Sequence, residues 1–583
     1  MGKFYNSIIR NSKLLKKQAL EHAFRSFSKK ELVVFFIFVA VLVFSTIAIL
    51  QKINQSFMVS VPMRGGSISE GIVGTPRFIN PALGFSDPDR DMMTLIYSGL
   101  MRKENSGRLI PDLAEKYEVS PDGLSYTFTL KEQLEFHNGS DVTAEDILFT
   151  INTIKDPLTK SPKKSNWDGV SVEKIDDRII RFTLKQPYAT FLENTTLGIM
   201  PAKLWSVSPV ELNEFNIRPI GSGPYMISQV NKESSGSVNS YKLTQFKKFA
   251  LGTPYLKNID LRFYGNEEEM ILALENGEVE QISSLTPKNA DALKGKNFVI
   301  KSSVLPRIFG FFFNQNENQL FTDKKIIEAI SLAINKDRIV NEVLGGYGIA
   351  IDDPIPPNMA LYQKLNSKEK SGHEENLIKA QEILTQHGWS KGEDGFLQKT
   401  ITNKDKKKNV TTLAFSISTG NAPELDQSAQ LIKEDLTALG IKIEIKTFEV
   451  GNLNQSVIRP RKYDTLLFGQ IINSASDLFA FWHSSQRNDP GLNVAMYTNA
   501  RVDTILEEAF VSTKESDRIK KYAQFESEIK KDVPAVFLYS PSFIYVVSKN
   551  LQGLDIERIN SPADRFSNVY AWVGIFFAAG AWV

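Results

Sequence analysis

The sequence contains few residues whose types and spacing could carry out a reaction. Its five histidines are spread from His22 to His483, and none belongs to an HExxH pattern or lies at metal-ligand spacing from another. The sequence has no GxSxG nucleophile elbow and no GxxxxGK[ST] phosphate loop. Gly221-Ser222-Gly223 has the wrong spacing for the elbow and is better interpreted as a turn before a strand. The absence of these catalytic motifs from a chain of 583 residues favours a binding function over catalysis. We therefore expect no enzyme activity and no cofactor.

The composition narrows the class of protein further. The chain has no cysteine, which excludes disulfides, thiolate nucleophiles, cysteine metal sites and a lipid-modified N-terminal cysteine. With 42% hydrophobic and 23% charged residues, it can bury a large core. Its net charge of +2 argues against a dedicated nucleic-acid binder.

The charge is distributed unevenly along the chain. Residues 1–50 contain eight basic and two acidic residues, a net +6, so the +2 of the whole chain leaves −4 for the remainder. Leu32 to Leu50 is an uncharged apolar run of nineteen residues, the length that a bilayer-spanning helix needs. The preceding basic residues predict a cytoplasmic N-terminus and an extracytoplasmic body. Gln51-Lys52-Ile53-Asn54 does not resemble a cleavage site, so an uncleaved signal anchor is favoured over a cleaved signal peptide.

The body has the pattern of a mixed α/β protein. Apolar residues recur at helical spacing from Leu425 to Leu439, Gly440 follows as a stop signal, and isoleucines then alternate with charged residues over 441–446. This helix–glycine–strand unit is typical of α/β layering. Asp323 is placed to cap a helix that follows it, and the alternation of residues 126–130 predicts a strand. Asp352-Asp353 lies in a polar stretch and is interpreted as a surface turn.

Twelve segments of the body together resemble one known family. In chain order they are Gly65 to Pro81, Ile96 to Leu100, Pro111 to Glu115, Ser120 to Gly123 with the strand that follows, Phe136 to Asp146, Pro219 to Tyr225, Phe313-Asn314, Ala329 to Arg338, Gly345 to Gly348, Tyr463-Asp464, Phe481 to Gln486, and Asp564-Arg565-Phe566. Their order over about residues 65–572 resembles the family 5 extracellular solute-binding proteins, the oligopeptide- and dipeptide-binding subunits of ABC importers. Each segment also has a structural role. Thr143, for example, is placed to cap a helix.

The resemblance implies a two-lobed α/β fold of the periplasmic-binding-protein type (type II, with an extra subdomain), preceded by one N-terminal transmembrane helix. The expected parts are a cytoplasmic basic segment (1–31), the anchor (32–50), a tether (51–64), lobe one (65–90, 205–308 and 537–583), an inserted subdomain of lobe one (91–204) and lobe two (309–536). The chain is expected to cross between the lobes near residues 307–314 and 533–539. Ligand binds between the lobes in such proteins, and closure buries it.

By the same resemblance, we expect a membrane-anchored protein that captures short peptides and delivers them to an ABC permease with its ATPase. Its partners would be a short peptide, the permease and ATPase, and the membrane through Leu32–Leu50, with no nucleic acid. It would be a single-pass protein of the cell membrane. The alternatives are a non-peptide solute, such as an oligosaccharide or a nickel chelate, and an extracytoplasmic hydrolase or adhesion protein on the same scaffold.

The resemblance also suggests ligand-binding residues. In peptide-binding relatives, an aspartate after a Gly-Trp-like pair holds the amino terminus of the ligand. Here the segment begins at Gly469, Gln470 replaces the tryptophan, Asn473 stands near the aspartate position and Asp477 follows four residues later. Asp477 could equally begin the next helix as its cap. The further candidates are Trp482, with core packing as an equal alternative, Phe311 and Tyr539 near the crossings, and Ser86 in a first-lobe loop that is also consistent with a surface turn.

Overall fold

The computed structural model describes residues 27–57, 64–104, 106–188, 190–296, 298–359, 372–402, 408–474, 477–512 and 514–574. The chain divides into two compact units, Met63–Ile575 and a smaller one that combines Met1–Pro62 with Phe576–Val583. The N-terminal helix belongs to the smaller unit, and all the sheets belong to the larger one.

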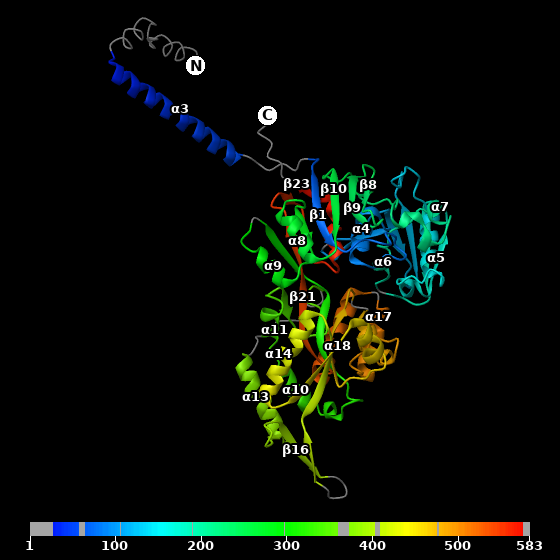
Figure 1. Cartoon of the computed structure of the whole chain (residues 1–583). Coiled ribbons are helices and arrows are strands. Elements are labelled where there is room, and N and C mark those ends of the chain that lie inside the picture. The colour runs from blue at the N-terminus through cyan, green and yellow to red at the C-terminus, as the bar shows by residue number, and fades with distance from the viewer. Residues whose placement is uncertain are drawn as a thin grey trace, which may run out of the picture. The chain divides into compact units, whose positions relative to one another are not determined.

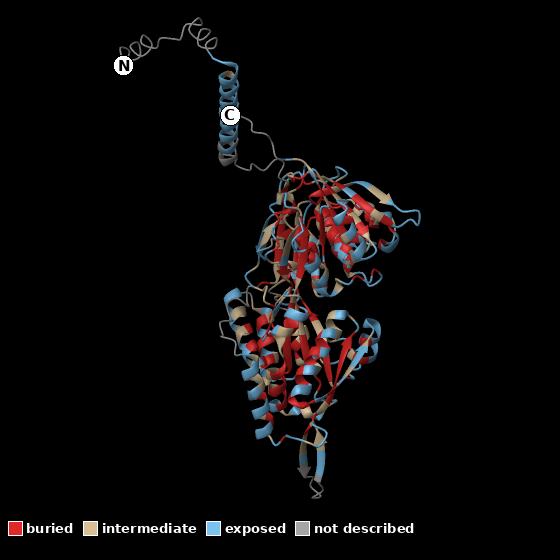
Figure 2. Ribbon diagram, turned by 60° about the vertical axis from the view of Figure 1, so that its left-hand side comes forward, coloured by how far each residue is buried: buried red, intermediate tan, exposed pale blue. Residues whose placement is uncertain are grey.

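The N-terminal helix α3 runs from Lys29 to Phe57, so it continues past the predicted end at Leu50. Its segment Lys29–Leu50 has a mean hydropathy of 3.1 over the most apolar window, and none of that window is buried against protein. Figure 2 shows the helix as exposed over nearly all of Lys29–Leu50. By length and composition it could cross a membrane. Its first turn is closed by Ser28, whose N–H and hydroxyl donate to Glu31 at 2.8 Å.

One lobe of the larger unit contains the first strand β1 (Ser67–Val73) at the centre of its sheet. β1 pairs in parallel with β10 (Asn258–Tyr264) and β11 (Gln281–Ser283). β9 (Val238–Gln245) and β8 (Tyr225–Lys232) continue the sheet in antiparallel order. The helix α4 (Asp87–Ile96) lies near this sheet, and α8 (Glu267–Glu275) packs on β1 and β10 (Figure 1).

A separate antiparallel sheet accompanies this first lobe. Its strand order is β4 (Ala114–Val119), β5 (Ser125–Leu130), β7 (Ile179–Leu184) and β6 (Val170–Lys174), and α5 (Ala144–Lys155) packs on it. β5 confirms the strand predicted at 126–130, because its even-numbered side chains are buried in the core. A two-stranded hairpin, β2 (Met101–Lys103) with β3 (Leu109–Pro111), precedes this sheet.

The second lobe is built on β18 (Ala414–Gly420), which pairs in parallel with β19 (Lys442–Phe448) and β20 (Thr465–Ile471). α10 (Lys324–Ala333), α13 (His373–Gln386) and α14 (Pro423–Leu439) cover one face of the sheet (Figure 1). α16 (Asp477–Trp482), α17 (Ala500–Val511) and α18 (Glu515–Asp532) contribute to the core on the other face. A small sheet of β15 (Ser390–Lys391), β16 (Leu397–Thr402) and β17 (Lys408–Thr412) extends from this lobe.

Two segments connect the lobes. β12 (Val299–Val304) pairs with the second half of β21 (Ala535–Val547), and β13 (Arg307–Phe313), which follows β12 directly, pairs with the first half of β21. β21 therefore belongs to both lobes and joins their strands into one twelve-stranded sheet. The two lobes also have separate cores of buried apolar side chains. The first-lobe core includes Leu305, before the chain crosses to the second lobe, and Phe543, after it has crossed back. The predicted two-lobed α/β fold is confirmed.

Alternate side chains of the connecting strand β13 pack into the two cores of the second lobe, one on each face of its sheet. Phe311 and Phe313 of β13 pack toward α10 and α14, whereas Ile308 and Phe312 pack toward α16 and α18. Successive side chains of a strand point to opposite faces, so one strand can serve two cores. This arrangement leaves β13 apolar on both faces, which explains its run of phenylalanines.

The local signals for helix ends are mostly confirmed. Asp323 caps α10 by accepting the Lys325 N–H at 3.0 Å, and Gly440 ends α14 with a φ of 98°, a conformation that favours glycine. The Asp146 carboxylate accepts the N–H of Thr143 at 2.9 Å at the start of α5. The interpretation of Asp352-Asp353 as a surface turn is wrong for Asp353, which is 2% exposed and forms an ion pair with a lysine of α18.

Candidate ligand-binding site

A cavity of about 510 Å³ lies between the two lobes. The first lobe contributes the β2–β3 hairpin, residues 190–193 and the segment 558–567, and the second lobe contributes residues 358–359, residues 473–474 and the first turns of α18. A second cavity of about 470 Å³ adjoins it and shares Lys103, Glu193, Asn473, Asn560, Asp564 and Ser567 with it. Volumes of this size are typical of ligand pockets.

The charged groups of the first cavity are largely paired. Lys103 lies 3.5 Å from Glu193, and Arg108 lies 2.9 Å from Glu104. The Asp564 carboxylate accepts the backbone N–H of Asn560 at 2.8 Å and closes the short helix that it begins. The cavity therefore presents charges of both signs rather than a field of one sign.

Asn473 is the sequence-predicted residue that the structure places at the site. It follows β20, it is exposed, and it lines both cavities. Its backbone N–H donates to Asp477 at 2.8 Å, which fixes the loop but leaves the side-chain amide for another partner. An amide carries two donors and an acceptor, so it can bind either end of a peptide unit.

The Asp477 carboxylate accepts hydrogen bonds from the backbone of the same loop. Its Oδ2 accepts the N–H of Asn473 and, at 3.1 Å, that of Ser474, at the start of α16. Burial raises the pKa of the Asp477 carboxyl, while these backbone donors oppose the rise. Both N–H groups that Asp477 accepts precede α16, so its carboxylate orders this loop, and Asp477 lines neither cavity. Its contact with ligand stays a prediction.

Gly469 lies in β20 directly opposite Phe309 of β13. A Cβ added at Gly469 would lie 2.9 Å from the Phe309 ring, and that ring stacks on Tyr539 with centroids 4.9 Å apart. The neighbouring Gln470 is 3% exposed, and its side-chain oxygen has no hydrogen-bond partner among the described residues. The structure therefore gives Gly469 a packing role within the sheet.

Trp482 is buried, with 1% of its surface exposed, and packs against Phe312, Phe537, Phe525 and Tyr497. Phe311 and Tyr539 are buried equally deeply in the core on the opposite face of the sheet. Burial raises the pKa of the Tyr539 hydroxyl to about 12. None of the three lines the inter-lobe cavities, so the packing supports the core alternative that the sequence left open for Trp482.

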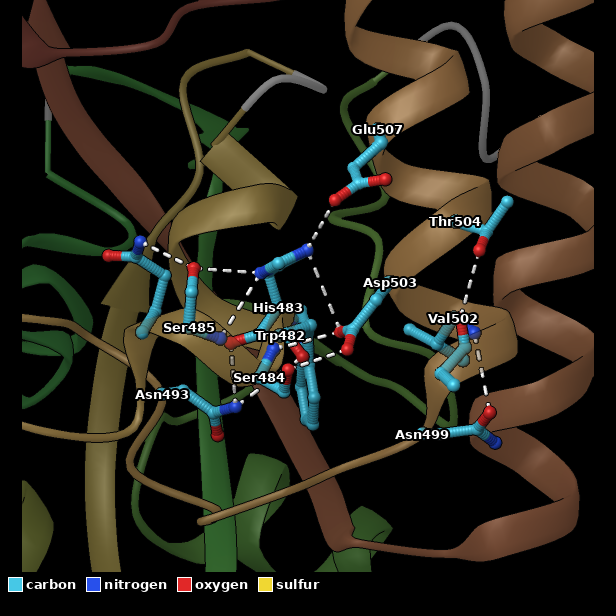
Figure 3. A network of polar contacts seen from close by, with 12 residues as sticks. Trp482, His483, Ser484, Ser485, Asn493, Asn499, Val502, Asp503, Thr504 and Glu507 are labelled. Carbon is cyan, nitrogen blue, oxygen red and sulfur yellow. Dashed lines mark hydrogen bonds and ion pairs between the residues drawn. The ribbon is translucent and has the colours of Figure 1, made fainter.

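The polar residues after Trp482 form a network inside the second lobe (Figure 3). His483 Nδ1 lies 2.8 Å from the Ser485 hydroxyl, and its Nε2 lies 3.3 Å from Glu507. The Asp503 carboxylate accepts the backbone N–H of Ser484 at 2.8 Å. These contacts attach the segment to α17, so this part of the family-like sequence positions elements rather than reacting groups.

Ser86 caps α4. Its hydroxyl accepts the Asp89 N–H at 3.2 Å, and the Asp89 side chain accepts the Ser86 N–H at 3.3 Å. Ser86 lines neither cavity, and its role as a ligand contact stays a prediction.

His137, in the family-like segment Phe136 to Asp146, also has a structural position. Its Nδ1 accepts the Gly221 N–H at 3.3 Å, and its Nε2 lies 3.1 Å from the Gly223 carbonyl oxygen. Only a neutral ring with the proton on Nε2 satisfies both contacts. Burial lowers the pKa of His137 to about 4, in agreement with that state.

Several residues of the cavities were not predicted from the sequence. They are Arg90 on α4, Lys163 before a short helix, Lys103 on the β2–β3 hairpin, and Asn358 and Tyr522 of the second lobe. No local pattern marks them, because they come from five distant segments. Among the described residues, no group of three histidine or acidic side chains is arranged to hold a metal ion.

Comparison with known proteins agrees with this arrangement. The model of the family described as "Bacterial extracellular solute-binding proteins, family 5 Middle" matches residues 108–491. The oligopeptide-binding protein AppA of Bacillus subtilis is 27% identical over 521 residues, which cover 88% of this chain and 92% of that protein. The glutathione-binding protein GsiB of Escherichia coli is 27% identical, over 78% of this chain and 85% of that protein.

Solved structures share the fold. The structure of Bacillus subtilis AppA in complex with a nonapeptide superposes with a TM-score of 0.66 at 27% identity and covers 88% of this chain and all of that one (100%). NikZ from Campylobacter jejuni, solved with Ni(L-His), gives a TM-score of 0.67 at 24% identity, with 87% of this chain and 99% of that one covered. The ligands of these two relatives differ, whereas their architecture is the same.

Proposed function

The chain belongs to family 5 of the bacterial extracellular solute-binding proteins, and from this premise we propose that it captures short peptides between its lobes and delivers them to an ABC permease. The observation that supports the proposal is the inter-lobe cavity, which is lined by paired charges and by the amide of Asn473. An extended peptide offers free backbone donors and acceptors along its length, and a side-chain amide can satisfy one of each. Relatives named for oligopeptide and glutathione binding agree with this ligand class.

Mass spectrometry of the full chain, purified in detergent without a peptide additive, tests the ligand class. We expect short peptides to be released on denaturation, and a library of peptides of mixed length to raise the unfolding temperature. Peptides recovered from protein that was incubated with the library should have the masses of intact library members, because we propose binding without cleavage. Stabilisation by sugars or metal chelates alone would contradict the peptide ligand, and chelator-resistant cleavage would contradict the absence of catalysis.

Asn473 provides the matched test of the site. Asn473→Ala should weaken peptide binding about tenfold through the loss of one or two hydrogen bonds. Asn454→Ala, an exposed asparagine of the same lobe outside both cavities, should leave binding unchanged. Equal affinities for the two variants in isothermal titration with the best library peptide would remove Asn473 from the site.

We infer that α3 anchors the protein to the cell membrane, with its N-terminus in the cytoplasm. The support is the exposed apolar stretch of Lys29–Leu50 and the excess of basic residues before it. The protein should stay in the membrane fraction after an alkaline wash. Protease added to spheroplasts should digest the body but leave an N-terminal tag intact. Release by the wash, or loss of the tag, would contradict the anchor or its orientation.

A further inference from the structure

The second cavity, which the first lobe lines except for Asn473, contains two cations that have no strong acidic partner. Lys163 and Arg90 both line it. The Lys163 Nζ donates to the Pro81 carbonyl oxygen at 2.9 Å, and no ion pair of Lys163 is found among the described residues. Arg90 lies 3.8 Å from Asp87, a pair in which both side chains are about half exposed (46% and 51%). Such an exposed, long contact contributes little.

The acidic groups of this cavity are already engaged elsewhere. Asp112 accepts from Arg102 at 2.8 Å and is 1% exposed, and Glu193 pairs with Lys103. The remaining acid, Asp564, accepts two backbone N–H groups at the start of its short helix. When these contacts are accounted for, Lys163 and Arg90 leave positive charge facing the cavity.

The surroundings of Lys163 add to this positive charge. Burial, together with the neighbouring Arg90, lowers the pKa of Lys163 to about 8. Arg307, at the start of β13, is influenced by the charge of Asp87 and, more weakly, by that of Arg90, and its Nε is buried with no hydrogen-bond partner among the described residues. Three cations and one half-exposed carboxylate, that of Asp87, thus stand near the place where the chain first crosses between lobes. Lys163 is half-buried, and a half-buried ammonium beside a guanidinium is stabilised when an anion joins it.

We propose that Lys163 and Arg90 form an anion subsite of the ligand cavity, which holds a carboxylate of the bound peptide. The inference rests on the proposed peptide function and adds to it a preference for ligands with a free carboxylate at one end or in a side chain. The ammonium supplies a compact point charge and the guanidinium a planar pair of donors, a combination suited to the two oxygens of a carboxylate. The adjoining cavity, with its charges of both signs, then receives the rest of the peptide.

The test compares matched peptide libraries on the full chain in detergent. One library has free C-terminal carboxylates, the second has the same sequences amidated, and a third is amidated but contains one glutamate in each peptide. Retention on the protein is measured by mass spectrometry, and inorganic phosphate is assayed separately by its effect on the unfolding temperature. We expect the free-acid library, the glutamate library or both to be retained about tenfold better than the plain amidated one.

Variants then assign the preference to the two cations. Lys163→Gln and Arg90→Gln should each bring the ratio of retained carboxylate-containing peptide to retained amidated peptide close to one. Lys163→Arg should keep the ratio of the wild type. Lys164→Gln is the matched control: it removes the same charge one residue later, from a lysine that pairs with Asp168 at 2.9 Å and lines neither cavity. That variant should retain the full preference.

The outcomes separate the subsite from the peptide function. Peptides bound without preference for a carboxylate, or a preference unchanged in Lys163→Gln and Arg90→Gln, would overturn the subsite and leave peptide capture standing. If no library binds but phosphate stabilises the wild type and not Lys163→Gln, peptide capture fails, and the two cations are an anion site that serves a different ligand than a peptide carboxylate. If neither libraries nor phosphate bind, both proposals fail.

Discussion

At the scale of single residues, a buried arginine is the side chain whose loss we expect to destabilise the body most. Arg565 donates from both terminal nitrogens to Asp91 at 2.7 Å and from Nε to Glu70 at 2.8 Å, and all three side chains are buried. Tyr545 donates to Glu70 at 2.7 Å from β21. Two carboxylates share one guanidinium, and burial raises the pKa of Asp91 to about 6. This cluster joins β1, α4 and β21 to the cavity segment 558–567, which contains Arg565.

Replacement of Arg565 should destabilise the fold strongly. Arg565→Gln leaves two buried carboxylates without their cation, and we expect a loss of about 3–5 kcal/mol in the free energy of unfolding. Arg181→Gln removes an exposed arginine that pairs with Glu173 at 3.7 Å, and should change it by less than about 1 kcal/mol. Urea unfolding monitored by tryptophan fluorescence measures both. Similar midpoints for the two variants would contradict the assigned role of the cluster.

His137 should make stability depend on pH in a defined window. Its native pKa is about 4, whereas an unfolded histidine has a pKa of about 6.5. Between these values the unfolded chain binds a proton that the native state does not, so stability falls as pH drops from 6.5 to 4 and is retained above 6.5. The full effect, reached below pH 4, is roughly 3 kcal/mol.

The variant His137→Gln tests this window, because glutamine can donate and accept in the same place but does not titrate. Urea midpoints of wild type and variant should converge as the pH falls from 7 to 4.5. A difference between them that stays constant over this range would show that His137 is not the titrating group.

At the scale of elements, the close pairing of β13 with β20 explains one glycine of the predicted site. Gly469→Ala places a methyl group 2.9 Å from the Phe309 ring, which can move only by disturbing its stack on Tyr539. We expect a loss of about 1–3 kcal/mol from overpacking. Gly451→Ala, where the added Cβ meets nothing within 4 Å, is the control and should be nearly neutral.

Thermal unfolding of the two glycine variants, with and without bound peptide, distinguishes packing from ligand contact. If Gly469 acts through packing, its alanine variant loses stability by the same amount in both conditions. A variant that is as stable as wild type but binds peptide weakly would assign Gly469 to the ligand site instead.

At the scale of the whole body, a ring stack and a hydrogen bond between described residues join the lobes away from the connecting strands. Tyr188 of the first lobe stacks on Phe510 of α17 with centroids 5.0 Å apart, and the Asn358 amide donates to the Ile559 carbonyl oxygen at 3.2 Å. Phe510 in turn lies 6.0 Å from Phe479 of α16. If the lobes open and close around ligand, the Tyr188–Phe510 stack favours the closed state by about 1 kcal/mol.

The absence of cysteine permits a direct measurement of closure. Leu158 in the first lobe and Val450 in the second are 82% and 71% exposed, so Leu158→Cys with Val450→Cys gives a unique pair of spin-label sites. Tyr188→Ala should shift the label distances toward the open state about fivefold in population. Phe510→Ala should do the same, and the double variant should add nothing further, because both remove one contact. Additive shifts would show that Tyr188 and Phe510 do not stabilise the closed state through their contact with each other.

Much of the architecture was predictable because it depends on local chemistry. The caps at Asp323 and Gly440 and the alternation of residues 126–130 specify their elements through contacts a few residues apart. The ordered segments predicted the two-lobed fold, and the apolar run before Leu50 predicted the exposed helix. The prediction for Asp353 failed because its partner, Lys530, comes from a distant helix that no local pattern indicates.

The candidate site depends on tertiary structure. Asn473 was predicted and lies at the cavity, whereas Trp482, Phe311 and Tyr539 are packed within the second lobe. An aromatic residue near a crossing has the same local pattern whether it faces ligand or core, and only the packing of the sheet faces distinguishes the two. Likewise, Lys163 and Arg90 meet only because two remote segments fold against one cavity. The sequence by itself therefore determined the class of protein and its elements, since these follow from short-range pattern and composition. Only the tertiary structure decided which side chains can touch a ligand, since that is a matter of burial and of contacts between distant residues.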